Sequence, residues 1–249
     1  MPFSQNVSLY RLFALVVAFA IVSTIVPART WAAADVVAKR DAGSVGYTDA
    51  VLTSATAKTA KLNPIISTLA LKDNQTIGTK AASRAIVSLP DSSAITIGAN
   101  TFVQVGAFKV ADAATGSGAG ATLKVIGGVI RLDIRHPAGG KSNYTFTTNT
   151  SQIAVRGTVA LIKAADSQDT IACLTCDPGD VDVTDKNGKR YSLITGQVLT
   201  VTLAGAVVAA MTAVILGQFA GAGVSTAAGE LAEDDGGHRC DDGARQGDG

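Results

Sequence analysis

Apolar and polar residues alternate along the middle of the chain with a period of two, which is typical of β-strands that bury one face. The alternation is clearest from residue 81 to about residue 202. Between the apolar positions 130 and 134, Arg131 and Asp133 are expected to face solvent. The positions expected to face a core are Ala85, Val87, Leu89, Ile95, Ile97, Val103, Val105, Ile130, Leu132, Ile134, Tyr144 and Phe146.

Turn signals separate these short segments. "PDSS" (90–93) and "GAN" (98–100) are turns, "ATGSGAGA" (114–121) is a loop, and Asn187-Gly188 is a strong hairpin signal. Two segments, "IVSLPDSSAITIGANT" and "VDVTDKNGKRYSLITGQV", share the order strand, acidic turn, strand, glycine, which is a weak sign of an internal repeat. Short strands with regular turns predict a mainly β domain, either a short β-roll of stacked strands or a β-sandwich.

The segment "SQIAVRGTVALI" (151–162) carries a glycine inside an apolar pattern. Taken as one strand, it places Gly157 on the core face between Val155 and Val159. Glycine in a strand marks a bend or a close approach, and we expect Tyr144 and Phe146 to fill this notch. Arg156 then lies on the outer face, where it pairs with an acid or a backbone carbonyl.

The N-terminus has the organisation of a secretory signal peptide. Arg11 precedes an uncharged apolar run of 15 residues, which is too short to span a membrane, and small residues follow. The sequence predicts a signal peptide over residues 1–34, with cleavage between Ala34 and Asp35, and therefore a periplasmic or secreted protein. Residues 35–80 are weakly patterned and are expected to form one or two short strands with a loop near Asn63-Pro64.

A second apolar stretch lies near the C-terminus, where no charged residue occurs between Tyr191 and Gly229. Residues 203–222 are predicted to form an apolar helix that packs on the β domain or self-associates. The alternative is a membrane anchor through residues 198–217, although basic residues are missing directly after it. The tail, residues 223–249, is predicted to be disordered.

Charge excludes one class of partner. Removing the signal peptide takes away Arg11 and Arg29, which leaves 19 basic against 20 acidic residues and a net charge of about −1. A chain without a basic field has no electrostatic basis for binding nucleic acid.

Several segments together resemble the periplasmic domain of the ferric-citrate regulator (FecR) family. They are "GTKAASRAIVSLPDSSAITIGANTFVQV", "GGVIRLDI", "YTFTTNTSQIAVRGT" and "LITGQ", over roughly residues 45–202. The acidic turn reads Asp-Ser-Ser here, where the family pattern reads Asp-Gly-Ser. The residues that match the family's structural motifs are Asp91, Ser92, Ser93, Gly98, Asn100, Thr101, Arg156, Gly157, Thr158, Gly196 and Gln197.

The resemblance implies a scaffold and not a reaction. Well-known members of the family join this domain to a cytoplasmic anti-sigma segment and a membrane helix, and they relay a receptor signal to a sigma factor. Here a signal peptide stands where the cytoplasmic segment would be, so we do not expect sigma-factor regulation. We expect a stand-alone, exported form.

Cys173 and Cys176 lie in "CLTCDPGD" between an expected strand and a turn. Export into an oxidising compartment favours a disulfide that closes this turn. A redox-active pair would need a helix N-terminus, and a zinc site would need His238 and Cys240 from the tail. Cys240 is left as an odd cysteine.

Two classes of function follow. The first is a non-catalytic module that binds an envelope or extracellular protein by strand addition at an exposed edge, without a cofactor or metal. The alternative is an envelope hydrolase that uses aspartates such as Asp91 and Asp133. The chain has two histidines, of which His136 stands in a turn, and no serine lies in a nucleophile motif. These features favour the binding module.

Overall fold

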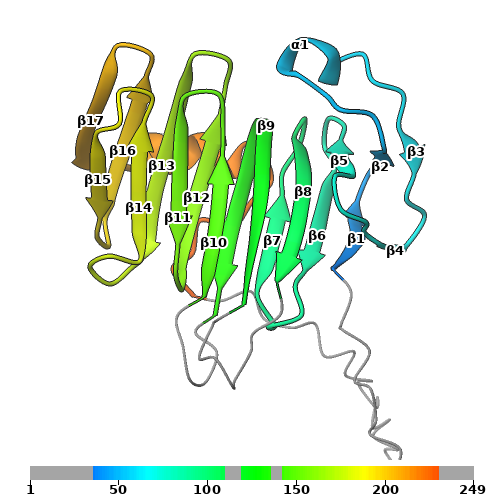
Figure 1. The fold of residues 1–249 in the computed structure, drawn as a ribbon, viewed down its shortest axis with the longest axis horizontal. Helices are drawn as coiled ribbons and strands as arrows, with labels where there is room; N and C mark the ends of the chain where they lie inside the picture. Colours follow the sequence, from blue (N-terminus) through cyan, green and yellow to red (C-terminus); the bar gives the residue numbers. More distant parts are fainter. Residues whose placement is uncertain (1–35, 110–118, 136–141, 230–249) are drawn as a thin grey trace, which may run out of the picture. The chain divides into compact units, whose positions relative to one another are not determined.

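The computed structural model describes residues 36–109, 119–135 and 142–229, and the strands in these ranges form two stacked sheets (Figure 1). The predicted signal peptide and its cleavage site, His136, His238 and Cys240 lie outside the described residues. Sheet A has the order β4 (Thr68–Ala70), β1 (Val37–Ala42), β6 (Arg84–Ser88), β7 (Ala94–Ile97), β9 (Gly120–Ile134), β12 (Thr158–Ala164), β13 (Gln168–Thr175), β16 (Gln197–Thr202) and β17 (Gly205–Ala210). Sheet B has the order β3 (Asn63–Pro64), β2 (Val45–Thr48), β5 (Thr76–Thr79), β8 (Phe102–Lys109), β9, β10 (Asn143–Thr147), β11 (Ser151–Val155), β14 (Val181–Asp185) and β15 (Arg190–Leu193).

The long strand β9 belongs to both sheets. Its first half pairs with β8 and, in parallel, with β10, and its second half pairs with β7 and β12. The change of sheet falls at Gly127-Gly128, and Gly128 has a φ of +107°. From β10 onward the chain lays hairpins alternately in sheet B and sheet A, so the prediction of a sandwich-like stack of short strands is confirmed.

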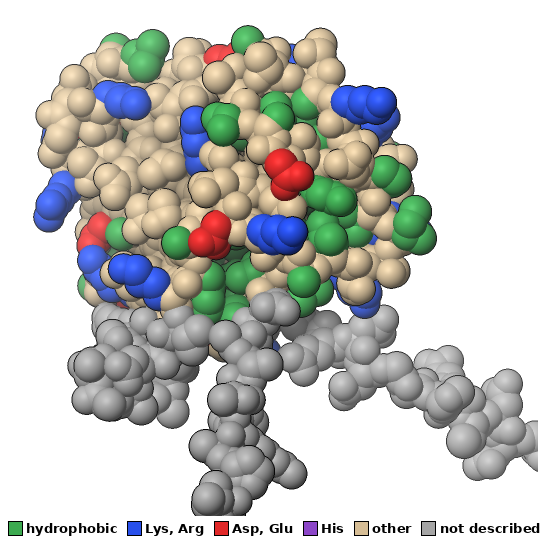
Figure 2. Space-filling view, turned by 45° about the vertical axis from the view of Figure 1, so that its right-hand side comes forward, with side chains coloured by type: hydrophobic (Ala, Val, Ile, Leu, Met, Phe, Trp, Pro, Cys, Tyr) green, Lys and Arg blue, Asp and Glu red, His purple; other side chains and the backbone are tan. Residues whose placement is uncertain are grey.

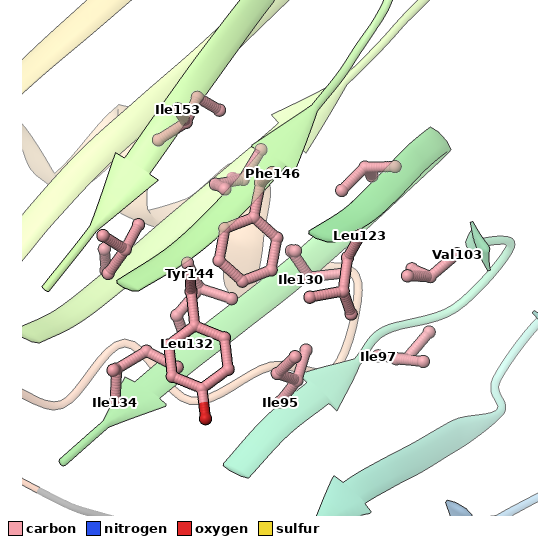
Figure 3. Close-up of a cluster of buried hydrophobic side chains, with 14 of the residues drawn as sticks. Ile95, Ile97, Val103, Leu123, Ile130, Leu132, Ile134, Tyr144, Phe146 and Ile153 are labelled. Carbon is pink, nitrogen blue, oxygen red and sulfur yellow. The ribbon is translucent and has the colours of Figure 1, made fainter. Parts of the chain in front are cut away.

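The core lies between the two sheets (Figure 3). Ile95, Ile130 and Leu132 from sheet A pack toward Leu123 and Phe146 from sheet B, and all are fully buried. The alternation correctly identified these positions apart from Leu123, because each segment has one face turned to the opposite sheet.

The outer face of sheet A is also covered, which the sequence pattern did not predict. Helix α2 (Ala213–Ala220) and the segment after it pack on a second apolar cluster (Figure 1). Its fully buried or nearly buried members are Val129, Val159, Leu161, Ala172, Leu174, Val198, Phe219 and Val224. Strands β9, β12 and β13 are therefore buried on both faces.

This second cluster explains why the interpretation of residues 151–162 as one strand was wrong. Ile153 and Val155 in β11 face the core between the sheets, whereas Val159 and Leu161 in β12 belong to the outer cluster. The chain turns from sheet B to sheet A at Gly157, whose φ is +124°. Gly157 is thus a corner and not a notch that aromatic side chains fill.

The C-terminal region also differs from the prediction. Residues 203–222 are not one helix: Leu203 and Ala204 turn the chain, β17 pairs with β16, and α2 begins after the N-cap Thr212. Hydropathy alone could not separate an apolar edge strand from an apolar helix. The tail predicted from residue 223 begins with residues that pack on sheet A.

Residues 36–80 contain more structure than expected. Five strands, β1 to β5, and the short helix α1 (Ser54–Ala57) replace the one or two strands predicted. The Thr53 side chain caps α1, and Leu52 and Ala57 pack with Ile126 on the outer face of sheet B. Of the loop predicted over residues 114–121, residues 120 and 121 belong to β9 instead.

Candidate functional site

The acidic turn between β6 and β7 ties the two sheets together. Asp91 Oδ1 accepts the N–H of Ser93 at 3.0 Å, and Asp91 Oδ2 accepts the hydroxyl of Tyr144, in sheet B, at 2.6 Å. Ser92 takes a left-handed φ of +64°, and Ser93 Oγ accepts the N–H of Arg135. Burial and the neighbouring Asp91 carboxylate raise the pKa of Tyr144, so its hydroxyl stays a donor. Asp91 therefore acts as a structural acceptor.

The Gly-x-Asn-Thr turn supports the crossing point of β9. Thr101 Oγ1 accepts the N–H of Val129 at 2.8 Å, just after Gly128, and the Thr101 N–H donates to Thr79 Oγ1 at 3.0 Å. Asn100 has a φ of +51°. A Cβ on Gly98 would lie 2.7 Å from the carbonyl oxygen of Ala222, so this glycine admits the C-terminal segment.

The Arg-Gly-Thr motif holds the corner between β11 and β12. Arg156 Nη1 donates to the carbonyl of Gly179 at 2.6 Å and to Asp182 Oδ2 at 2.8 Å, the two kinds of partner expected from the sequence. Burial by itself would raise the pKa of the Asp182 carboxyl. Hydrogen bonds from Arg156 and Ser192, with the charges of Arg156 and Arg190, outweigh burial and hold that pKa below its usual value.

The predicted disulfide joins Cys173 to Cys176, whose Cα atoms are 6.0 Å apart. Thr158 packs against it and donates its hydroxyl to the carbonyl of Thr175 at 2.5 Å. Cys173 lies in β13 and Cys176 follows it directly, with no helix N-terminus at either cysteine, so the structure supports a disulfide of the structural kind.

The last motif, Gly196-Gln197, forms the turn before β16. Gly196 has a φ of +82°, and its N–H donates to the carbonyl of Cys173 at 3.0 Å. Gln197 Oε1 accepts the N–H of Ile194 at 3.2 Å. The motifs bond to different neighbouring strands and turns, and they do not assemble into one site.

A buried ion pair lies where the sequence pattern predicted solvent-facing residues. Arg131 and Asp133 stand on the outer face of β9, and Arg131 Nη2 donates to Asp133 Oδ1 at 2.6 Å. The Arg131 side chain is 0% exposed and that of Asp133 is 6% exposed. The prediction that they face solvent was wrong because the C-terminal segment covers them.

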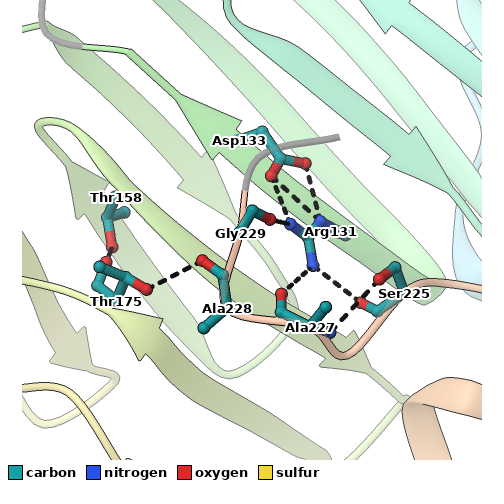
Figure 4. A network of polar contacts seen from close by, with 8 residues as sticks. All are labelled: Arg131, Asp133, Thr158, Thr175, Ser225, Ala227, Ala228 and Gly229. Atoms are coloured by element: carbon teal, nitrogen blue, oxygen red, sulfur yellow. Dashed lines mark hydrogen bonds and ion pairs between the residues drawn. The ribbon is translucent and has the colours of Figure 1, made fainter. Parts of the chain in front are cut away.

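We call residues 222–229, which cross the outer face of sheet A, the C-terminal strap. Its carbonyls converge on the Arg131 guanidinium: Nη1 donates to Ser225 at 3.1 Å and to Ala227 at 2.6 Å, and Nη2 donates to Gly229 (Figure 4). Thr175 Oγ1 donates to the carbonyl of Ala228 at 3.0 Å. The only available signal in the sequence was the pair of opposite charges two residues apart on one strand, which places both side chains on the same face.

A second buried polar cluster, around Asp169, was also missed. Asp169 Oδ2 accepts the hydroxyls of Thr148, Thr150 and Ser151, the last at 2.7 Å. All four residues are buried, and Asp169 Oδ1 has no hydrogen-bond partner. Sheet A is thereby joined to the β10–β11 turn of sheet B.

Two cavities in the described part of the chain are lined by neither Asp91 nor Asp133. One, of about 210 Å³, lies near α1 and is lined by residues that include Lys58, Asn100 and Asp166. The other, of about 330 Å³, is lined mainly by alanine and glycine, with Ser83 and Arg84. The two aspartates of the hydrolase alternative, Asp91 and Asp133, are engaged separately by Tyr144 and Arg131. Among the described residues, no three metal-binding side chains cluster.

The surface feature that stands out is β17, which forms one edge of sheet A. Met211 N–H donates to Gly196 O, and β17 runs antiparallel to β16 in the same register. Hydrogen-bonded and non-hydrogen-bonded pairs alternate along an antiparallel ladder. The N–H and C=O groups of Ala206, Val208 and Ala210 therefore point away from β16. Within the described part of the chain no strand pairs with β17 on that side.

Apolar side chains accompany this open edge. Val207 is 69% exposed and Val208 is 42% exposed, and Leu203 in the turn before β17 is 63% exposed. Val207 lies on the outer face, opposite Thr200, and Val208 lies on the inner face, opposite Leu199. Both faces of the strand therefore present valine.

The other three sheet edges are protected in the usual ways. β3 has two residues and ends in Pro64, β4 has three residues, and β15 begins with Arg190. Proline, short length and charge all disfavour pairing with another strand. On the face that Figure 2 shows, charged side chains lie between small apolar groups and are not gathered by sign.

Among the described residues, these features define a β-sandwich domain with one unprotected edge. Residues 75–182 match the family model described as "FecR protein", in agreement with the motif resemblance.

Two crystal structures of a "putative anti-sigma factor" from Parabacteroides distasonis ATCC 8503, at 2.50 and 1.65 Å resolution, are similar to the chain. Their sequence identities are 16% and 17%, and their TM-scores are 0.44 and 0.45. The similarity covers 55% of this chain and 60% of theirs. A search of curated proteins found no match.

The anchor alternative is not supported as it was predicted. Residues 198–217 comprise most of β16, the whole of β17 and the start of α2, and not one helix. Of the helices that the structure describes, none combines the length and apolar character needed to cross a membrane.

Proposed function

We propose that the protein is an exported, non-catalytic FecR-type module of the bacterial envelope or cell exterior that binds a partner protein by strand addition at β17. The unprotected edge is the observation that carries this proposal. Three edges have the protection that sheets normally carry, whereas β17 offers six residues with no charge and no proline.

The polar residues of the motifs support a binding role over catalysis. Asp91, Thr101, Arg156 and Thr158 direct their polar groups to the backbone or to side chains of neighbouring strands and turns. Residues engaged in this way hold the sandwich in shape, so recognition falls to surfaces that lie elsewhere. Strand addition would give affinity through main-chain hydrogen bonds and specificity through the valine side chains.

Export is part of the same proposal. The N-terminal pattern and the disulfide between Cys173 and Cys176 are consistent with an oxidising compartment. We expect the mature chain to begin at or near Asp35. A signalling role within the envelope fits the family, and the partner would be a protein that offers an extended strand.

The test is cross-linking of a tagged full chain in the exporting cell, with identification of the captured species by mass spectrometry. We expect one stoichiometric partner, a second copy included, with the parent protein and a loss of capture with Val207→Lys. The control is Val214→Lys on α2, where the parent side chain is also exposed, at 77%. Capture that survives Val207→Lys, or a protein without any partner, would contradict the proposal.

A further inference from the structure

We propose that the strand that pairs with β17 is β17 of a second copy, so that sheet A continues across a two-fold axis at Val208. This inference rests on the proposed function, because it names the partner at the same edge. It makes the protein a symmetric dimer, which is the commonest form of closed homo-oligomer.

The backbone of β17 is self-complementary about Val208. Ala206, Val208 and Ala210 carry the unpaired N–H and C=O groups and are spaced evenly about Val208. An antiparallel copy centred there places Val208 opposite Val208 of the second copy and Ala206 opposite Ala210 of the second copy. Each of these is a position at which antiparallel strands exchange both N–H···O bonds.

The side chains fit the same register. On the inner face Val208 meets its own counterpart, and Ala206 and Ala210 leave room on either side. On the outer face Val207 meets Ala209 of the second copy. Pairing therefore covers Val207 and Val208, which are exposed in the single chain.

The uncharged sequence of β17 favours a second copy over another protein as the strand that pairs with this edge. A two-fold axis places the residue on the axis opposite its own copy and brings the residues next to it close to theirs, so a charge on or beside the axis lies near a like charge. β17 carries no charge over Gly205–Ala210, and the uncharged region extends on both sides of the strand. At β15 the same symmetry would bring Arg190 and its basic neighbour Lys189 toward their own copies. The edge suited to self-pairing is thus the one left unprotected.

The closing experiment is a charge swap at the axis in the full chain, with molecular mass measured by sedimentation equilibrium. The parent protein is expected to be a dimer. Val208→Lys and Val208→Glu are each expected to weaken dimerisation about tenfold or more, because like charges then stand opposite each other. An equimolar mixture of the two variants is expected to restore the dimer, because lysine then faces glutamate. This rescue separates loss of pairing from loss of folding, and Val214→Lys should leave the mass of the dimer unchanged.

The outcomes also separate this inference from the proposed function. A parent protein that is monomeric, but whose capture of another protein is lost with Val207→Lys, overturns the second copy and leaves strand addition standing. A dimer that persists in both Val208 variants uses another surface and overturns the inference. Failure of the mixture to restore the dimer overturns the two-fold register at Val208.

Discussion

Polar groups are used in opposite ways in two regions: residues 75–182, which match the FecR family model, and the C-terminal region, residues 197–229. In the first, side chains such as Asp91, Thr101 and Asp169 are turned inward and bonded across sheets or turns. In the second, no residue is charged, the edge of β17 has unpaired backbone groups, and Val207 and Val214 are exposed. Under the proposed function, the first region builds the scaffold and the second offers a surface to a partner.

The two regions meet at Arg131. This side chain belongs to β9 of the first region, and its guanidinium binds the carbonyls of the strap in the second. One arginine thus satisfies both a buried carboxylate and a segment that has no charged side chain of its own. The contrast between the regions depends on this contact, and changes near it are expected to have the largest effects.

Arg131→Met is expected to lower the free energy of unfolding by roughly 3–5 kcal/mol, because it leaves Asp133 buried without its partner and the strap carbonyls without donors. Urea unfolding measures the loss, and limited proteolysis should show cleavage in residues 225–229 at a protease level that spares the parent. The double change Arg131→Met with Asp133→Leu is expected to regain part of the stability, since no unpaired charge then remains. Equal protection of the strap in parent and variant would show that Arg131 does not hold it.

Gly128→Ala tests the scaffold alone and is expected to cost about 2–5 kcal/mol. The added Cβ would lie 2.3 Å from Thr101 Oγ1 and 2.5 Å from Thr101 Cα, at a φ of +107°. The matched control is Gly188→Ala, at a φ of +80° with no atom within 4 Å of the added Cβ, which should cost only the backbone strain of about 1–2 kcal/mol. Thermal melts of both variants decide the point. Equal losses would mean that Thr101 can move aside and does not fix the crossing of β9.

The inner faces of the strands and the hairpin at Asn187-Gly188 could be predicted from sequence, because each strand buries one face against the other sheet. The pattern failed where a second layer intervenes. Val159 and Leu161 continue the alternation of Ile153 and Val155 in sequence. Ile153 and Val155 face the core between the sheets, whereas Val159 and Leu161 lie on the outer face of sheet A. The corner at Gly157 reverses the phase, and periodicity does not record a corner.

The same second layer hid the buried ion pair between Arg131 and Asp133. A solvent-facing position for Arg131 and Asp133 followed from local alternation, whereas their burial depends on a strap about 95 residues away in the chain. The apolar run of residues 203–222 indicated burial, yet Leu203, Val207 and Val214 are largely exposed. Its secondary structure was also open, since alanine and valine fit both an edge strand and a helix. Long-range packing decided each case, and a single sequence carries no direct signal for it.

Arg156→Ala should have the smallest effect, and it bears most directly on the contrast between the two regions. Arg156 and Asp182 are each about one-third exposed, so we expect a loss of about 0.5–1 kcal/mol. The pKa of Asp182 is depressed in the folded state, so its ion pair contributes stability above the unfolded pKa of about 3.9, and that contribution is lost as pH falls through the folded pKa. The difference between parent and variant should therefore be larger at pH 7 than at pH 3, and it should shrink in high salt. Chemical unfolding at the two pH values measures it.

Partner capture and molecular mass of the Arg156→Ala variant should match the parent, because Arg156 belongs to the scaffold. A variant of unchanged stability that no longer binds its partner would instead make the Arg-Gly-Thr corner a recognition site and would erase the division of roles between the two regions.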